Sequence, residues 1–272
     1  MAVQAHNYQG RGSEMADAPI IAISGASGLF GSAFLAKYSE NLQVTKSLKL
    51  KTLADADIYK EIESISASGT QTFLHLAWPA SSAKENYRFS EENFDALRKT
   101  VLLREACFRM GINFVGIGTV LDKVGMADSH YQLAKFSCRQ MFRHEIEEER
   151  ITWVRPHYVF NDDSWPIFLH SDESLAVTIH NNSPRDFIHL DDVISGLFLI
   201  LEKQLFGEID LGSGWLTKPS ELCEVFGKDF IVDHSGSVGV QFEASPTASL
   251  HPLLSQHWAP TKTHALLKEK LR

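Results

Sequence analysis

Short apolar runs alternate with amphipathic segments between residues 20 and 202. The run IIAIS at 20–24 is apolar throughout, as is typical of a strand that is buried on both faces. We predict strands at 20–24, 42–45, 72–77, 113–118 and 151–155, and helices at 29–38, 55–65, 84–110, 129–149 and 191–202. Strands and helices that alternate at this interval form βαβ units, so we expect an α/β fold with a doubly wound parallel sheet.

The alternation ends near Pro156, and the later segments are shorter and richer in Ser, His, Asp and Pro. We expect them to form a smaller lobe over the carboxyl edge of the sheet, where α/β proteins bind ligands. The polar N-terminus has no apolar core of a signal peptide and is expected to be a flexible arm. The expected division is an arm at 1–18, a large domain at 19–156 plus 185–204, and a substrate lobe at 157–184 plus 205–272.

Composition narrows the classes of protein that the chain can belong to. The 272 residues carry a formal net charge of −8, with 26 basic and 34 acidic side chains, which argues against nucleic acid as a partner. No apolar run approaches the roughly 18 residues that a membrane-spanning helix needs. The three cysteines, Cys107, Cys138 and Cys223, are widely spaced and are expected to be buried thiols in a reducing compartment. We therefore expect a cytoplasmic protein with no membrane segment.

A glycine-rich loop follows the first predicted strand directly. Gly25, Gly28 and Gly31 are spaced GxxGxxG, and the third of them lies in the first turn of the first predicted helix. Such glycines permit a tight turn, close approach of the backbone to a pyrophosphate, and close packing of the helix on the sheet. The loop favours a Rossmann-type sheet that binds a dinucleotide.

A YxxxK pattern lies on the helix predicted at 129–149. Tyr131 and Lys135 are four residues apart, so one helical face carries both side chains. A nearby ammonium is expected to lower the pKa of the phenol and to make it a usable acid or base near neutral pH. This helix follows the strand that ends at Gly118 and Thr119, two βα units beyond the glycine loop. That position favours a functional role over an incidental pair of surface residues.

Together these motifs resemble the extended short-chain dehydrogenase/reductases, in the NAD-dependent epimerase/dehydratase group that modifies sugar nucleotides. The resemblance runs from about residue 20 to the C-terminus. Its marks are GASGLFG at 25–31, HLAW at 75–78, Asn93, YQLAK at 131–135, RPHYVF at 155–160, RDFIHLDDV at 185–193 and DLGSG at 210–214. The glycine loop with YxxxK is specific for the superfamily, and no motif names a substrate.

The resemblance implies roles for four residues. Tyr131 matches the tyrosine that exchanges a proton with the sugar oxygen while hydride moves to or from the nicotinamide. Lys135 matches the lysine that also holds the nicotinamide ribose. Thr119 is the candidate for the hydroxyl that bonds the reacting oxygen, or else a strand cap, because only 12 residues separate it from Tyr131. Arg185 matches an arginine that contacts the substrate diphosphate, and a structural ion pair is its alternative.

The resemblance also implies a cofactor site. Its expected residues are Gly25, Ser27, Gly28, Leu29, Phe30, Gly31, Lys46, Asp55, Ala77, Trp78, Tyr131, Lys135 and Pro156. The segment at 44–49, where an acidic residue would bind the 2′-hydroxyl of NAD, contains two lysines and no acid. Lys46 suits the 2′-phosphate of NADP, whereas Asp55 can approach the adenine end of NAD. We expect NADP, with NAD as the alternative.

Three functions remain open at the level of sequence. The first is an NADPH-dependent keto-sugar reductase, the second is a sugar-nucleotide epimerase that retains NAD, and the third is a non-catalytic NAD(P)-binding regulator. Dehydratases of the group carry an acidic pair after the active-site threonine, but Val120 and Leu121 stand here. Metal catalysis has no support, since no HxxxH or HExxH pattern occurs. The helices at 84–110 and 131–149 resemble the pair that forms a four-helix homodimer interface in the family.

Two smaller expectations concern polar residues in apolar surroundings. His75 and His189 lie within apolar runs and are expected to be packed core histidines. Asp191 is expected to be the N-cap of the helix that follows.

Overall fold

The computed structural model describes residues 18–79, 87–123, 129–161, 177–179, 182–232, 248 and 250–270. The expected arm, apart from residue 18, lies outside the described residues, as do parts of the expected lobe and the start of the helix predicted at 84–110. None of the described helices is long and apolar enough to cross a membrane.

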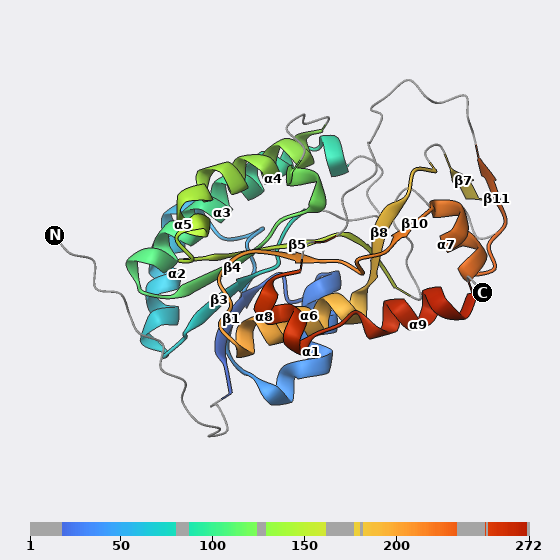
Figure 1. The fold of residues 1–272 in the computed structure, drawn as a ribbon. Coiled ribbons are helices and arrows are strands. Elements are labelled where there is room, and N and C mark those ends of the chain that lie inside the picture. The colour runs from blue at the N-terminus through green and yellow to red at the C-terminus, as the bar shows by residue number, and fades with distance from the viewer. Residues whose placement is uncertain are drawn as a thin grey trace.

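The described chain contains a six-stranded parallel sheet between two layers of helices (Figure 1). The strand order is β2-β1-β3-β4-β5-β9, which confirms the predicted doubly wound, Rossmann-type α/β fold. The strands of this sheet are β1 (Ile20–Ser24), β2 (Gln43–Leu48), β3 (Thr72–His75), β4 (Asn113–Ile117), β5 (Thr152–Pro156) and β9 (Gly207–Leu211).

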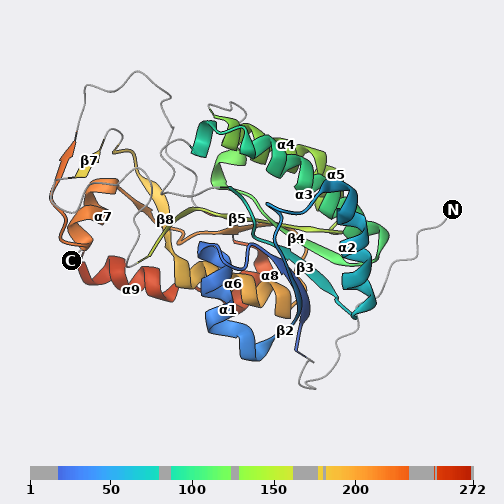
Figure 2. The same ribbon diagram turned by 180° about the vertical axis from the view of Figure 1, so that it is seen from behind.

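Helices cover both faces of this sheet (Figure 2). One face carries α2 (Asp55–Ala67), α3 (Glu92–Arg109), α4 (His130–Met141) and α5 (Arg143–Glu147), and the other carries α1 (Leu29–Tyr38), α6 (Leu190–Glu202) and α8 (Pro252–His257). Short 3-10 turns lie at Ser39–Asn41, Tyr87–Phe89 and Val120–Lys123.

The two layers explain why nearly every residue of β1, β3 and β4 is buried. Neighbouring residues of a strand point to opposite faces, so each strand supplies both cores. Phe73 and Phe114 pack in the core under α2 and α3, whereas Leu74 and Val115 pack in the core under α1 and α6. Trp153, which is fully buried, fills the first core at β5.

The smaller elements gather beyond the carboxyl edge of the large sheet (Figure 1). A three-stranded sheet has the order β10-β8-β6, and β11 pairs with β7. The bounds are β6 (Tyr158–Phe160), β7 (Val177–Ile179), β8 (Arg185–His189), β10 (Leu216–Thr217), β11 (Phe230–Val232), α7 (Pro219–Val225) and α9 (Thr261–Lys270). Their apolar side chains form a third core that includes Phe160, Phe187 and Leu222.

Several boundaries differ from the prediction. The predicted domain division places 185–189 with the large domain and 207–211 with the lobe, but β8 belongs to the small sheet and β9 completes the large one. The single helix predicted at 129–149 is interrupted at Phe142, which is buried against Phe114 and Trp153. Packing of this aromatic side chain accompanies the end of the first helix and the start of the second.

Candidate active site

The carboxyl ends of β1, β3 and β4 bring three loops to one edge of the sheet. The glycine loop follows β1, Ala77 and Trp78 follow β3, and Gly118 and Thr119 follow β4. Gly25 has φ +79°, and a Cβ there would lie 2.6 Å from the Ala77 backbone nitrogen. The glycine loop therefore packs directly on the backbone of the loop that follows β3. Residues widely separated in the sequence thereby meet at the edge where doubly wound sheets bind ligands.

The three glycines of the loop differ in what the protein itself requires of them. A Cβ at Gly31 would overlap the carbonyl oxygen of Gly25, so the loop and α1 pack only with glycine there. A Cβ at Gly28 would lie 3.3 Å from the same oxygen, which asks for only a small adjustment. Gly28 is also the N-cap of α1, and Ser27, Gly28 and Leu29 are exposed. The open backbone at Gly28 fits close approach of a pyrophosphate.

Tyr131 lies in the first turn of α4, between aromatic side chains. The ring meets Trp78 edge-on, with centroids 6.3 Å apart, and Tyr87 with centroids 5.6 Å apart. Its hydroxyl is hydrogen-bonded to the Thr119 side chain. The structure thus brings Thr119 and Tyr131 together despite the short segment between them. Ser129 caps α4 by accepting the Gln132 N–H, which fixes the start of this helix.

Lys135 lies one turn further along α4 and is buried. Its Nζ donates to the Ile117 carbonyl oxygen at 2.6 Å and lies 3.5 Å from the centroid of the Trp78 ring. Burial lowers the pKa of Lys135 to about 7. Burial also raises the pKa of Tyr131, so the expected lowering of the phenol pKa by the ammonium is not what the site shows. Desolvation is the largest cause of the raised pKa of Tyr131, and Lys135 is not among the groups that shift it.

Asn93 is a site residue to which sequence reasoning assigned no role. It is fully buried, and its Oδ1 accepts the Trp78 Nε1–H at 2.9 Å. Its Nδ2 donates to the carbonyl oxygens of Tyr87 and Ser90 at 2.7 and 2.9 Å. Asn93 therefore fixes the indole that lies against Tyr131 and Lys135. The signal in the sequence was its place among the motifs of the family resemblance, which gave Asn93 no role.

The two residues expected to select the cofactor both have protein partners. Lys46 lies within β2, and its Nζ is 2.5 Å from Oε2 of Glu61 on α2. Asp55, the first residue of α2, pairs with Arg98 on α3. Lys49 instead follows the carboxyl end of β2 and is exposed. The structure thus offers Lys49 as a second basic side chain near the expected 2′-position.

The remaining expected site residues lie at the junction with the small elements. Pro156 is the last residue of β5 and pairs with Leu211. Arg185 begins β8, is buried, and has its guanidinium 5.3 Å from the centroid of the Tyr158 ring. Desolvation by burial lowers the pKa of Arg185. The arginine is thus held by an aromatic neighbour.

The histidines of the apolar runs are core residues, as expected, because both His75 and His189 are buried. The expected helix cap was assigned to the wrong residue, since His189 is the N-cap of α6 and its Nδ1 accepts the Asp191 N–H. Asp192 instead accepts hydrogen bonds from the backbone N–H groups of Lys262 and Thr263 and ties α9 to α6. An imidazole nitrogen thus replaces the usual carboxylate at the cap.

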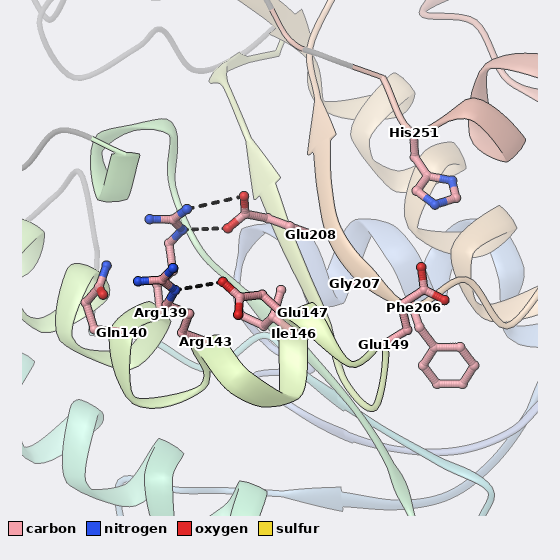
Figure 3. A pocket seen from close by; sticks show the side chains of 10 residues that line it. All are labelled: Arg139, Gln140, Arg143, Ile146, Glu147, Glu149, Phe206, Gly207, Glu208 and His251. Carbon is pink, nitrogen blue, oxygen red and sulfur yellow. Dashed lines mark hydrogen bonds and ion pairs between the residues drawn. The ribbon is translucent and has the colours of Figure 1, made fainter. Parts of the chain in front are cut away.

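A cavity of about 500 Å³ lies away from these residues, beside the amino end of β9 (Figure 3). Ion pairs between Arg139 and Glu208 and between Arg143 and Glu147 line it. The other lining residues are Gln140, Ile146, Glu149, Phe206, Gly207 and His251. Within the described ranges, no group of three or more His, Cys, Asp or Glu side chains is arranged to hold a metal ion.

Comparison with known proteins finds similarity in structure only. No protein-family model matches the sequence, and no curated protein matches it. UDP-glucose 4-epimerase from Thermotoga maritima, solved with UDP-glucose, has a TM-score of 0.66 and 18% identity, over 93% of this chain and 97% of that chain. GDP-L-fucose synthetase from Naegleria fowleri, bound to NADP, has a TM-score of 0.67 and 15% identity, over 94% and 92%.

A third solved structure has the same fold. dTDP-glucose 4,6-dehydratase from Bacillus anthracis, in complex with NAD, has a TM-score of 0.66 and 16% identity, over 93% of this chain and 96% of that chain. Each similarity spans nearly the whole of both chains. The chain therefore has the fold of the extended short-chain dehydrogenase/reductases, the group that its sequence motifs indicated.

Proposed function

We propose that the chain is an NAD(P)-dependent oxidoreductase that reduces the keto group of a sugar nucleotide. The observation that carries the proposal is the meeting of Thr119, Tyr131 and Lys135 beside the glycine loop, at the carboxyl edge of the sheet. The structural neighbours supply independent support, because they include sugar-nucleotide epimerases, a dehydratase and a GDP-fucose synthetase.

The residues of the edge suit a dinucleotide. The exposed backbone at Gly28 and the open N-terminus of α1 would receive the pyrophosphate, and Lys135 would hold the nicotinamide ribose. When bound, the nicotinamide supplies or accepts the hydride. Ala77 and Trp78 would line the site, since the glycine loop packs directly on the backbone of Ala77.

The protonation state of Tyr131 favours reduction. The phenol is protonated near neutral pH, and burial raises its pKa further above the ordinary value, so the side chain can give a proton to an oxygen that gains hydride on its carbon. Thr119 would bond the same oxygen, because its hydroxyl already lies against that of Tyr131. Oxidation of a hydroxyl would instead need a phenolate, which this environment disfavours.

The substrate class rests on the neighbours and on Arg185. The neighbours' names include UDP, GDP and dTDP sugars, which share a diphosphate. Arg185 would bind that diphosphate, because it begins β8 and lies against Tyr158 on β6, the strand that follows β5 in the chain. A planar guanidinium matches phosphate oxygens in pairs.

Lys49 is our candidate for the contact with the 2′-phosphate of NADP. It stands at the carboxyl end of β2, whereas Lys46 is engaged with Glu61. Lys49→Glu should weaken NADPH binding about tenfold or more and leave NADH binding nearly unchanged, as isothermal calorimetry would show. Lys46→Gln is the matched control and should change the ratio little.

A second candidate is an epimerase, which the structural neighbours favour. Several of them are 4-epimerases. Trp78 packs over Lys135, with Nζ 3.5 Å from the ring centroid. The same indole over the lysine is also compatible with a non-catalytic NAD(P)-binding regulator.

The deciding experiment measures cofactor balance. The purified protein is denatured, released nucleotides are identified, and NADPH consumption is followed with nucleotide-linked 4-keto sugars. Stoichiometric loss of NADPH supports the reductase. Retained NAD⁺ with no net consumption supports the epimerase, and binding without turnover of any sugar nucleotide supports the regulator.

A further inference from the structure

A buried carboxylate lies directly behind the candidate site. Asp122 is fully buried three residues after Thr119, in the 3-10 turn Val120–Lys123. Its Oδ2 accepts the Thr119 backbone N–H at 3.2 Å and the Trp153 Nε1–H at 2.9 Å. The Asp122 backbone N–H in turn donates to the Thr119 carbonyl oxygen at 3.0 Å. The conformation of the Thr119 turn therefore depends on this side chain.

The second oxygen of Asp122 has no hydrogen-bond partner among the described residues. Arg139 Nε and Arg155 Nη1 each lie 3.9 Å from Oδ1, too far for a hydrogen bond. Both guanidiniums are committed to other carboxylates. Arg155 contacts Glu208 at 2.5 Å and Asp210 at 2.7 Å, and Arg139 contacts Glu208 at 2.5 Å.

Two guanidiniums, those of Arg139 and Arg155, lie among three carboxylates, those of Asp122, Glu208 and Asp210. These five side chains carry one net negative charge when all are ionised, and the Lys135 ammonium is the further cation near them. Burial raises the pKa of Asp122 to about 6. The titratable and charged groups that face Asp122 are Tyr131, Lys135, Cys138 and Arg139 from α4, Arg155 from β5, and Glu208 and Asp210 from β9.

The network also has a path to the surface. Arg139 and Glu208, at its outer end, line the cavity beside β9 (Figure 3). Asp122 stands at its inner end, against the backbone of Thr119. The negative charge thus lies between the solvated side of α4 and the residues that would handle the substrate oxygen.

We propose that Asp122 is a positioning residue of the candidate active site, which holds the Thr119 turn and places a negative charge behind Tyr131 and Lys135. This inference rests on the proposed function of those three residues. The carboxylate stabilises the Lys135 ammonium that would hold the ribose, and it favours the neutral phenol of Tyr131. A neutral side chain of the same shape keeps the turn but loses the charge.

Asp122→Asn separates these two roles. The amide oxygen can accept the same two N–H groups, so circular dichroism and thermal unfolding should show a folded protein. Removing the negative charge should lower the pKa of Lys135 from about 7 by roughly one pH unit. The titration is followed by NMR of [ε-¹³C]lysine protein, with Lys135→Met to assign the resonance. This readout needs no turnover, so it holds even where the proposed activity fails.

Glu208→Gln is the matched control, because it removes a carboxylate of the same network that does not touch the Thr119 turn. Its Lys135 midpoint should stay close to that of the wild type. If the enzyme turns over, the alkaline limb of its kcat profile should move to lower pH with Asp122→Asn by the same amount as the lysine midpoint.

Trp153→Phe provides a second test that leaves the carboxylate in place. It removes one donor to Oδ2, which should raise the pKa of Asp122 and so lower that of Lys135 in the same direction. An unchanged Lys135 midpoint in folded Asp122→Asn, or in folded Trp153→Phe if the first variant does not fold, overturns the proposal.

Discussion

Tyr131 is oriented on three sides before any substrate arrives. Trp78 and Tyr87 meet its ring edge-on, and Thr119 bonds its hydroxyl. Asn93 fixes the Trp78 indole in turn. A phenol held in this way is pre-organised to give its proton in one direction.

Tyr131→Phe tests that role directly. The substitution removes the transferable proton and keeps the ring contacts, so turnover should fall by about 10²–10⁴-fold. Affinity for the dinucleotide should change little, because the phenol would touch the reacting oxygen. Lys135→Met should weaken both turnover and cofactor binding. Near wild-type turnover in Tyr131→Phe would show that Tyr131 is not the proton donor and would favour a non-catalytic NAD(P)-binding regulator.

Gly28→Val tests the pyrophosphate contact. A Cβ there meets only the Gly25 oxygen, at 3.3 Å, so the fold should survive while the branched side chain blocks the ligand. Calorimetry should show at least about tenfold weaker NADPH binding, with an unchanged circular dichroism spectrum. Gly31→Val is the contrasting variant and should unfold, since its side chain overlaps the loop. Wild-type affinity in Gly28→Val would place the cofactor elsewhere.

At the scale of elements, a chain of side-chain hydrogen bonds joins β1, β3 and α3. The Thr100 hydroxyl donates to the Ala96 carbonyl oxygen at 2.7 Å, so it accepts from His75 Nε2, 2.8 Å away. His75 Nδ1 then accepts from the Ser24 hydroxyl at 2.7 Å. The imidazole is therefore neutral with its proton on Nε2, and burial lowers its pKa to about 3.

This histidine should make the fold sensitive to acid. The unfolded chain binds a proton at His75 near pH 6.5, whereas the folded chain binds it only near pH 3. The free energy of unfolding therefore decreases as the pH drops from about 6.5 to about 3. Between pH 7 and pH 5 the loss should be about 2 kcal/mol from this group. Asp122, whose folded pKa is raised to about 6, acts in the opposite direction below that pH.

Urea unfolding at the two pH values checks this. His75→Gln should lower stability overall but reduce the loss between pH 7 and pH 5 by about 2 kcal/mol. His144→Gln, at an exposed position, should leave that loss unchanged. Equal losses in the wild type and in His75→Gln would show that the imidazole does not couple folding to pH.

The elements that sequence predicted best are those with local signals. The predicted bounds of 20–24 and 29–38 match β1 and α1, because an apolar run, a glycine loop and a helical stripe follow one another there. β8 and β9 were missed because their charged residues mask strand patterns. Buried Asp186 accepts hydrogen bonds from the backbone N–H groups of Ser213, Gly214 and Ala248. Asp210 accepts one from Arg155. All these partners lie far away in the sequence.

The candidate site shows the same limit. Spacing alone predicted that Tyr131 and Lys135 share a face, and the order of the motifs predicted the edge of the sheet. Neither signal predicted that Glu61 pairs with Lys46, that Asn93 fixes Trp78, or that Asp122 supports the Thr119 turn. Each depends on side chains brought together only when the helices pack.

At the scale of the whole molecule, α3 and α4 leave large apolar side chains exposed. Phe94 and Phe108 lie on α3, and Leu133 and Met141, eight residues apart on one face of α4, are 42% and 60% exposed. The two helices pack side by side over the sheet (Figure 1). We expect a second copy of the chain to cover this surface, because a two-fold pair would bury the same side chains on both partners.

We expect a homodimer of twice 30.5 kDa in sedimentation at micromolar concentration. Leu133→Glu with Met141→Glu should give a folded monomer, because charge on the shared face opposes burial. Ile231→Glu, on β11, is the matched control: it is 61% exposed and should stay dimeric. A wild-type monomer at that concentration would remove the expectation.

The pairing of β5 with β9 bears on how the chain reaches its folded state. Residues 152–156 pair with 207–211, and the described strands between them, β6, β7 and β8, belong to other sheets. Until residue 211 has been synthesised, β5 is an edge strand with unpaired backbone groups and Arg155 has no Asp210. Closing this long loop is slow relative to local helix formation. The last strand of the sheet thus also sets the interval during which a nascent chain is open to pairing with another.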